Sequence, residues 1–200
     1  GLALSKELGK LQDYLLGLRL LGGSLVSFEP RAPEEGFRLI DEAVEQARRH
    51  GHLEGIARGW TVRAFQEWEF SRQSAWKPGL RERAIASSLA ALDAVEAIRD
   101  RQGDAVVRAR TFSRWAHVYE RFVGHLLWPP DESASREDLD LAFSVLERKR
   151  ARVLLDELDA ARAAAALSPD GPAAQQRPRV LEEIARLQRQ LMNTGLPKEE

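Results

Sequence analysis

A helical motif that occurs twice constrains this chain more than any other feature. It runs from Gly51 to Phe70 and again from Gly103 to Phe122. With the two glycines in register, the matched pairs are Ala57 and Ala109, Arg58 and Arg110, Trp60 and Phe112, Ala64 and Ala116, and Phe70 and Phe122. An earlier copy begins at Gly9. A motif that recurs within one chain indicates stacked structural units rather than a single globular core.

Each copy places a small residue four positions after a bulky one. The bulky residues are Leu18, Trp60 and Phe112, and the small ones are Gly22, Ala64 and Ala116. Stacked helix pairs need small residues where their backbones approach, because a larger side chain would force the helices apart. The pattern therefore predicts antiparallel helix pairs that pack closely.

The positions of apolar residues predict which segments are helical. Apolar residues recur at intervals of three and four over 10–27, 33–50, 53–74, 79–101, 104–127, 139–158 and 180–191, and residues 2–8 read as the last turns of a further helix. Ser135 and Asp138 have the spacing of a capping box at the start of the helix over 139–158, and the alanine run 160–166 favours its extension. No segment has the period-two alternation of a strand, so we expect an all-α protein.

The helix–turn–helix units and their small contact residues resemble the tetratricopeptide (TPR) repeat. The resemblance implies a right-handed α-solenoid of antiparallel helix pairs, with about three degenerate repeats plus a C-terminal helix. The three glycines at 9, 51 and 103 are separated by 42 and 52 residues, which is longer than the spacing of a standard TPR. The alternative is an unrelated helical bundle.

A second resemblance covers 108–127, 137–161 and 180–191. These segments look like the region just upstream of the CHAT domain, a caspase-like peptidase fold, in bacterial TPR–CHAT proteins. The residues that match the last repeat helix of that family are Ala142, Phe143, Glu147, Ala151, Arg152, Leu154, Leu155, Asp156 and Leu158. The resemblance implies a regulatory or recognition module whose peptidase domain, with its His–Cys pair, would follow residue 200.

We therefore expect the chain to be a piece of a longer protein with three parts. Residues 1–163 are predicted to form the TPR-like helical repeat domain, and 164–179 an Ala/Pro-rich linker. Residues 180–194 are predicted to form a C-terminal helix that leads to the downstream domain.

Composition argues against several classes of function. Lys and Arg total 30 against 31 Asp and Glu, so no net basic charge suggests nucleic acid as a partner. No apolar run reaches the roughly 18–20 residues of a membrane span. The absence of cysteine excludes a disulfide, a thiolate zinc site and a cysteine nucleophile within the chain. We expect a cytoplasmic protein with no nucleic-acid or membrane partner.

No motif in this chain predicts catalysis, a cofactor or a metal site. His50 and His52 flank a glycine at a helix end, and no third ligand is placed beside them, whereas a metal ion usually requires three or four. A phosphate-binding loop and a nucleophile motif are both missing. The basic cluster Arg148, Lys149, Arg150 and Arg152 has acidic neighbours, so we expect it to form ion pairs rather than to bind nucleic acid.

The strongest candidates for partner binding are side chains on the first helix of each pair, which faces the concave surface of a TPR stack. Counted from the bulky residue, the positions two before, one after, five after and eight after it point inward. They select Arg58, Thr61, Phe65 and Trp68 in the second unit and Arg110, Ser113, His117 and Glu120 in the third. The two equivalent arginines would hold a carboxylate or an acidic peptide, and Phe65 and Trp68 would form an apolar anchor. The alternative is that the arginines pair with glutamates on the neighbouring helix and that Trp68 lies in the core.

These observations predict a non-catalytic protein–protein interaction module that binds a protein or peptide in its concave groove. By resemblance, it would recognise partners or substrates for a caspase-like peptidase in the same chain. The alternative is the TPR sensor region of a bacterial signalling kinase or of an ATPase-type transcriptional regulator. A His and Cys in a caspase-like domain after residue 200 would favour the first, and a kinase or nucleotide-binding domain before residue 1 the second. The partner's identity and the oligomeric state stay open.

Overall fold

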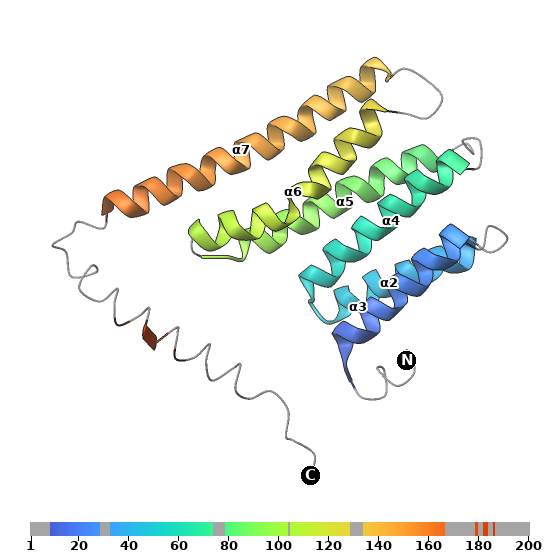
Figure 1. The fold of residues 1–200 in the computed structure, drawn as a ribbon, viewed down its shortest axis with the longest axis horizontal. Coiled ribbons are helices and arrows are strands. Elements are labelled where there is room, and N and C mark those ends of the chain that lie inside the picture. The colour runs from blue at the N-terminus through green and yellow to red at the C-terminus, as the bar shows by residue number, and fades with distance from the viewer. Residues whose placement is uncertain are drawn as a thin grey trace, which may run out of the picture. The chain divides into compact units, whose positions relative to one another are not determined.

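The computed structural model describes residues 9–28, 33–73, 79–103, 105–128 and 134–166, together with Arg179, Glu182, Glu183 and Arg186. These residues form six helices and contain no strand, which confirms the predicted all-α class (Figure 1). The helices are α2 (Leu11–Phe28), α3 (Pro33–Arg49), α4 (Leu53–Gln73), α5 (Leu80–Asp100), α6 (Ala105–Leu127) and α7 (Arg136–Ala166). None of these helices is both long and apolar enough to cross a membrane.

The chain divides into two compact units, residues 1–156 and 157–200. The first contains α2 to α6 and most of α7. In the second, α7 continues through Ala166, so the alanine run does extend this helix and the predicted linker over 164–179 begins within it. The predicted helix over 2–8, the rest of the linker apart from Arg179, and most of the helix over 180–194 lie outside the described residues.

Helix ends follow signals that are visible in the sequence. Gly51 has a positive φ of 62° and lies two residues after the end of α3 at Arg49. The N–H groups of Gly51 and His52 donate to the carbonyls of Arg48 and Ala47 at 3.0 and 2.8 Å, which closes the helix as a Schellman motif. His52 Nδ1 then accepts the Gly55 N–H at 2.8 Å and caps the start of α4. His52 thus has a structural role at the start of α4.

The capping box at the start of α7 is also present. The Ser135 Oγ accepts the N–H of Asp138 at 3.1 Å, and the Ser135 N–H donates to the Asp138 carboxylate at 3.1 Å. The same carboxylate accepts a hydrogen bond from Arg81 of α5. One residue therefore both caps α7 and links it to an earlier helix.

Consecutive helices pack antiparallel, α2 on α3, α3 on α4, α4 on α5 and α5 on α6, and α2 also contacts α4 (Figure 1). Two apolar cores support this arrangement. The smaller lies between α2 and α3 and includes Leu15, Leu18 and Ala43. The larger runs from α4 through α6 to α7, and Ile56 packs against both cores.

Two glycines form a close contact between α2 and α3. A methyl group at Gly22 would lie 2.6 Å from the Gly36 carbonyl oxygen and 2.8 Å from Cγ1 of Ile40. A methyl group at Gly36 would lie 2.6 Å from the Gly22 carbonyl oxygen. The backbones of α2 and α3 are thus in direct contact, as the small residue in the repeat predicts for this pair.

The last helix is joined to the others largely through charged side chains. Arg148 Nε and Arg152 Nη2 donate to the Glu96 carboxylate of α5 at 2.6 and 2.9 Å, and the Tyr119 hydroxyl donates to it at 3.1 Å. Burial raises the pKa of Glu96, but the hydrogen bonds from both arginines outweigh it and lower that pKa to about 2. Lys149 pairs with Glu120 and Arg150 with Glu147, so the basic cluster forms ion pairs as predicted.

We expect Gly22→Ala to lower the free energy of unfolding by roughly 1–3 kcal/mol, because the added methyl group would force α2 away from α3. Gly124→Ala in α6 is the matched control, since an added methyl group there has no neighbour within 4 Å. The control should raise the free energy of unfolding by about 0.5–1 kcal/mol through helix propensity. Urea denaturation measures both, and equal effects of the two variants would contradict the glycine contact.

The Glu96 cluster predicts a dependence of stability on pH. Its folded-state pKa lies below the ordinary value of 4.5, so its contribution is complete above pH 4.5 and is lost as the pH falls toward 2. At neutral pH the contribution is at most about 3 kcal/mol. Urea denaturation should therefore show that Glu96→Gln destabilises the protein at pH 7 and has a much smaller effect near pH 3. In the exposed control Glu45→Gln the effect should stay under about 1 kcal/mol throughout; a constant effect of Glu96→Gln across pH would contradict this account.

Candidate functional site

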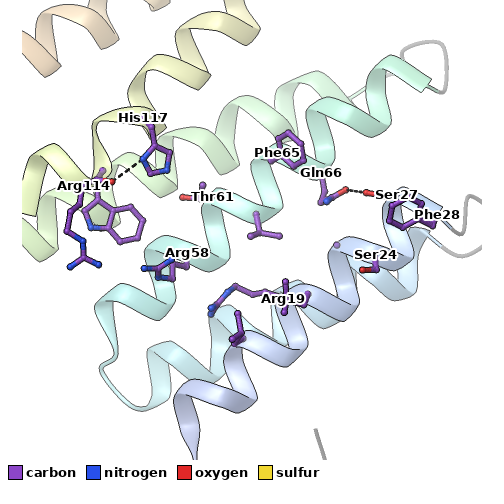
Figure 2. Close-up of a pocket in the computed structure, with 15 residues that line it drawn as sticks. Arg19, Ser24, Ser27, Phe28, Arg58, Thr61, Phe65, Gln66, Arg114 and His117 are labelled. Carbon is purple, nitrogen blue, oxygen red and sulfur yellow. Dashed lines mark hydrogen bonds between the residues drawn. The ribbon is translucent and has the colours of Figure 1, made fainter. Parts of the chain in front are cut away.

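A cavity of about 530 Å³ lies between α2, α4 and α6 (Figure 2). All of its lining residues belong to these three helices, which alternate along the chain with α3 and α5. Gly22 lies on the face of α2 that packs on α3. The adjacent face of α2 is therefore directed toward the cavity and forms one of its walls. Gly23 on that adjacent face lies close to the Gln66 side chain, since a methyl group at Gly23 would lie 3.2 Å from Gln66 Nε2. The Ser27 hydroxyl donates to Gln66 Oε1 at 3.1 Å and ties the two walls together.

One end of the cavity is apolar. Leu20 and Phe28 of α2 are exposed side chains, and Phe28 is 81% exposed. Phe65 of α4 lies on the opposite wall (Figure 2), and Val62 of the same helix also lines the cavity. Exposed large apolar residues that gather at a concave surface are typical of a binding site rather than of a random surface.

The other end of the cavity is basic and aromatic. Arg58 Nη2 donates to Glu54 Oε1 at 2.8 Å, and Arg114 Nη2 of α6 donates to the same oxygen at 3.2 Å. The hydrogen bond from Arg58 lowers the pKa of Glu54, so this carboxylate is charged near neutral pH. The Arg58 guanidinium also lies 5.4 Å from the centre of the Trp115 ring. Two arginines thus share one acidic partner.

A third arginine in the cavity, Arg19, is buried without such a partner. Its side chain extends from α2 toward Arg58 (Figure 2), and the residue is only 8% exposed. Burial lowers the pKa of Arg19, the positive charge of Arg58 lowers it further, and Glu54 opposes both effects. Among the described residues, no hydrogen bond or ion pair from Arg19 is present.

The other buried acids and arginines in the described part of the chain are all paired. Glu67 accepts hydrogen bonds from Arg63 and Ser87. Glu96 and Asp138 have the partners described above. Asp156 accepts two hydrogen bonds from Arg99, at 2.5 and 3.3 Å. Buried charges are costly unless they are paired, so Arg19 is the exception that calls for a functional explanation.

Four of the predicted groove residues lie together at this site. Arg58, Thr61, Phe65 and His117 all line the cavity. His117 lies on the α6 wall with its Nδ1 3.0 Å from the carbonyl oxygen of Arg114 (Figure 2). The structure therefore brings predicted residues of α4 and α6 to one cavity.

The other four predicted residues lie elsewhere. Trp68 is 2% exposed, its indole N–H donates to the Ser88 hydroxyl at 3.2 Å, and it belongs to the larger core. Arg110, Ser113 and Glu120 are exposed on α6 and do not line the cavity. Glu120 pairs with Lys149 of α7 at 2.7 Å. The predicted pair of equivalent arginines is thus replaced by Arg58 and Arg114, with Glu54 between them.

Arg19 was not among the residues that the sequence selected, although the same rule finds it. The offsets that were applied to Trp60 and Phe112 select Leu16, Arg19, Gly23 and Val26 when they are counted from Leu18. The first three of these residues line the cavity. Arg114 and Trp115 have no such signal, because their offsets from Phe112 are outside the rule.

The chemistry available at the cavity is that of binding. It combines guanidinium donors, aromatic faces and aliphatic side chains, which suit an extended chain with apolar and anionic groups. In the described part of the chain, no group of three or more His, Asp and Glu side chains is placed to hold a metal ion.

The unpaired charge of Arg19 predicts an unusual mutational effect. We expect Arg19→Met to raise the free energy of unfolding by about 1 kcal/mol, because it keeps a long side chain of similar size and removes a buried cation that lacks an acceptor. Thermal and urea denaturation measure the change. Arg49→Met, which removes an exposed arginine paired with Glu45, should change stability by under about 1 kcal/mol. A marked loss of stability in Arg19→Met would mean that its charge is satisfied in the folded protein.

Comparisons with protein-family models, with curated proteins and with solved structures found no match. The basis for a function is therefore the geometry and chemistry of this cavity.

Proposed function

We propose that this chain is a non-catalytic recognition module that binds a segment of a partner protein in the cavity between α2, α4 and α6. The observation that carries the proposal is the cavity itself: exposed apolar side chains at one end, guanidinium groups at the other, and walls contributed by three successive helix pairs. A protein segment offers both an apolar and a charged surface over this length, whereas a small apolar ligand would leave Arg19 without an acceptor.

The architecture that we propose is a right-handed, TPR-like α-solenoid whose concave face is this cavity. Three observations support it. The helices pack sequentially and antiparallel, α4 contacts α2 as the next first helix should, and the small residue of the first unit mediates a backbone contact. Stacked units of this kind provide extended concave surfaces for proteins.

We further propose that the module recognises partners or substrates for a caspase-like peptidase of the CHAT type in the same protein. The support is the sequence match in Ala142, Phe143, Glu147, Ala151 and Arg152, together with the residues that follow them up to Leu158. All of these residues belong to the single helix α7. The sequence beyond Glu200 tests this part: a domain with a His–Cys pair supports it, and a kinase or nucleotide-binding domain before Gly1 contradicts it.

Site-specific photo-crosslinking in the intact protein tests groove recognition. A photoreactive amino acid at Leu20, which lines the cavity, should give a discrete crosslink to a partner protein in cells. The same amino acid at Glu45, an exposed residue of α3 outside this cavity, is the matched control and should not. Ser24→Trp, which places a large ring in the cavity from an exposed helical position, should remove the Leu20 crosslink. Equal labelling from both positions, or a crosslink that survives Ser24→Trp, would contradict binding in this groove.

A further inference from the structure

We propose that Arg19 binds the carboxylate of an aspartate or glutamate in the interior of the partner segment, and that an apolar or aromatic residue of the same segment occupies the Phe28 end of the cavity. This inference rests on the proposed function, because it names the chemistry that the groove selects. It identifies Arg19 as the residue that determines specificity.

The argument begins with the balance of charges around the cavity. Arg58 and Arg114 already donate to Glu54, so their charges are partly compensated. Arg19 is buried beside them and donates to no acceptor in the described residues. A guanidinium can form two parallel hydrogen bonds to a carboxylate, and this pair is among the strongest in proteins. A carboxylate from the partner would therefore complete the site.

Glu54 also favours a carboxylate over a phosphate. It remains charged near neutral pH and lies within hydrogen-bond distance of both Arg58 and Arg114. A phosphate group with nearly two negative charges would meet the repulsion of this carboxylate. One carboxylate would supply the acceptor that Arg19 lacks among the described residues.

The position of Arg19 along the groove indicates an internal side chain rather than a chain terminus. A second cavity of about 290 Å³ continues toward Gln12 and His52, and it shares Leu16, Arg19 and Arg58 with the first. Space therefore extends along α2 on both sides of Arg19. A segment that passes through would fill both cavities, whereas a segment that ended at Arg19 would leave one of them empty.

The distance to the apolar end sets the spacing of the recognised residues. Phe28 follows Arg19 by nine residues on one helix, which corresponds to roughly 13–14 Å. An extended peptide covers that distance in about four residues. We therefore expect an acidic residue and an apolar or aromatic residue separated by about four positions.

Peptide pools test this inference on the full chain. One pool contains short acetylated and amidated peptides with glutamate at the central position, and the other has glutamine there. The flanking positions vary over all amino acids except cysteine, aspartate and glutamate. Affinity selection followed by mass spectrometry should enrich peptides from the glutamate pool that carry an apolar or aromatic residue about four positions from the centre.

The best peptide and its glutamine counterpart are then measured by calorimetry. Glutamate should bind roughly tenfold or more tightly than glutamine, since one charged hydrogen-bonded pair is removed. Arg19→Met should abolish this preference, and Arg49→Met should keep it. A thermal melt of Arg19→Met verifies that the variant is folded, and Arg19→Lys, which keeps the charge without the planar fork, should retain part of the preference.

The possible failures are distinguishable. Equal binding of glutamate and glutamine peptides that is lost in Ser24→Trp would overturn the role of Arg19 and leave groove recognition in place. The best peptide is also prepared with a free C-terminal carboxylate, and tighter binding of this form than of the amidated one would overturn the internal position. If neither pool is enriched, or if Ser24→Trp leaves binding unchanged, the proposed groove function fails as well.

Discussion

The backbone contact between Gly22 and Gly36 determines where the walls of the cavity stand. Because no side chain separates them there, α2 lies directly on α3, and α3 in turn packs on α4. The next face of α2, which carries Arg19 and Gly23, is then directed toward α4. The absence of a side chain at Gly23 leaves room for Gln66, which joins the two helices through Ser27. The adjacent glycines Gly22 and Gly23 thus allow α2 to pack closely on α3 and on α4, respectively.

Local features of the sequence predicted most of the fold, because they act within a few residues. Gly51 ends α3 through a conformation that other residues rarely adopt, and Ser135 with Asp138 caps α7. The spacing of apolar residues gave helix bounds within a few residues of those observed. The site was harder to predict from the sequence, because it depends on which face of each helix packs against the neighbouring helix. Trp68 occupies a position that the repeat rule assigned to the groove, yet a hydrogen bond to Ser88 and burial place it in the core.

The sequence indicated that charged side chains form ion pairs, but it did not indicate which residues pair with one another. The acidic neighbours of Arg148, Lys149 and Arg150 indicated ion pairs, but the main partner of Arg148 is Glu96, which lies 52 residues earlier. The lack of a hydrogen-bond acceptor for Arg19 among the described residues is still harder to predict, because it depends on the side chains of three helices at once. Arg19 also differs from the other buried acids and arginines of the described helices, which are all paired. Local violations of such rules at a cavity are expected where a protein gives up stability for binding.

The two kinds of helix contact in this molecule respond differently to solution conditions. Two apolar cores join α2 to α6, and their contacts depend little on salt or pH, although the pairs Arg63–Asp41 and Arg114–Glu54 also link these helices. Charged side chains contribute much of the contact of α7, and those of Arg148 with the exposed Asp93 and of Lys149 with Glu120 are open to screening. The Arg99–Asp156 pair is buried and is screened far less. Because the cavity walls belong to α2, α4 and α6, its shape depends mainly on the apolar cores that hold these helices rather than on the ion pairs of α7.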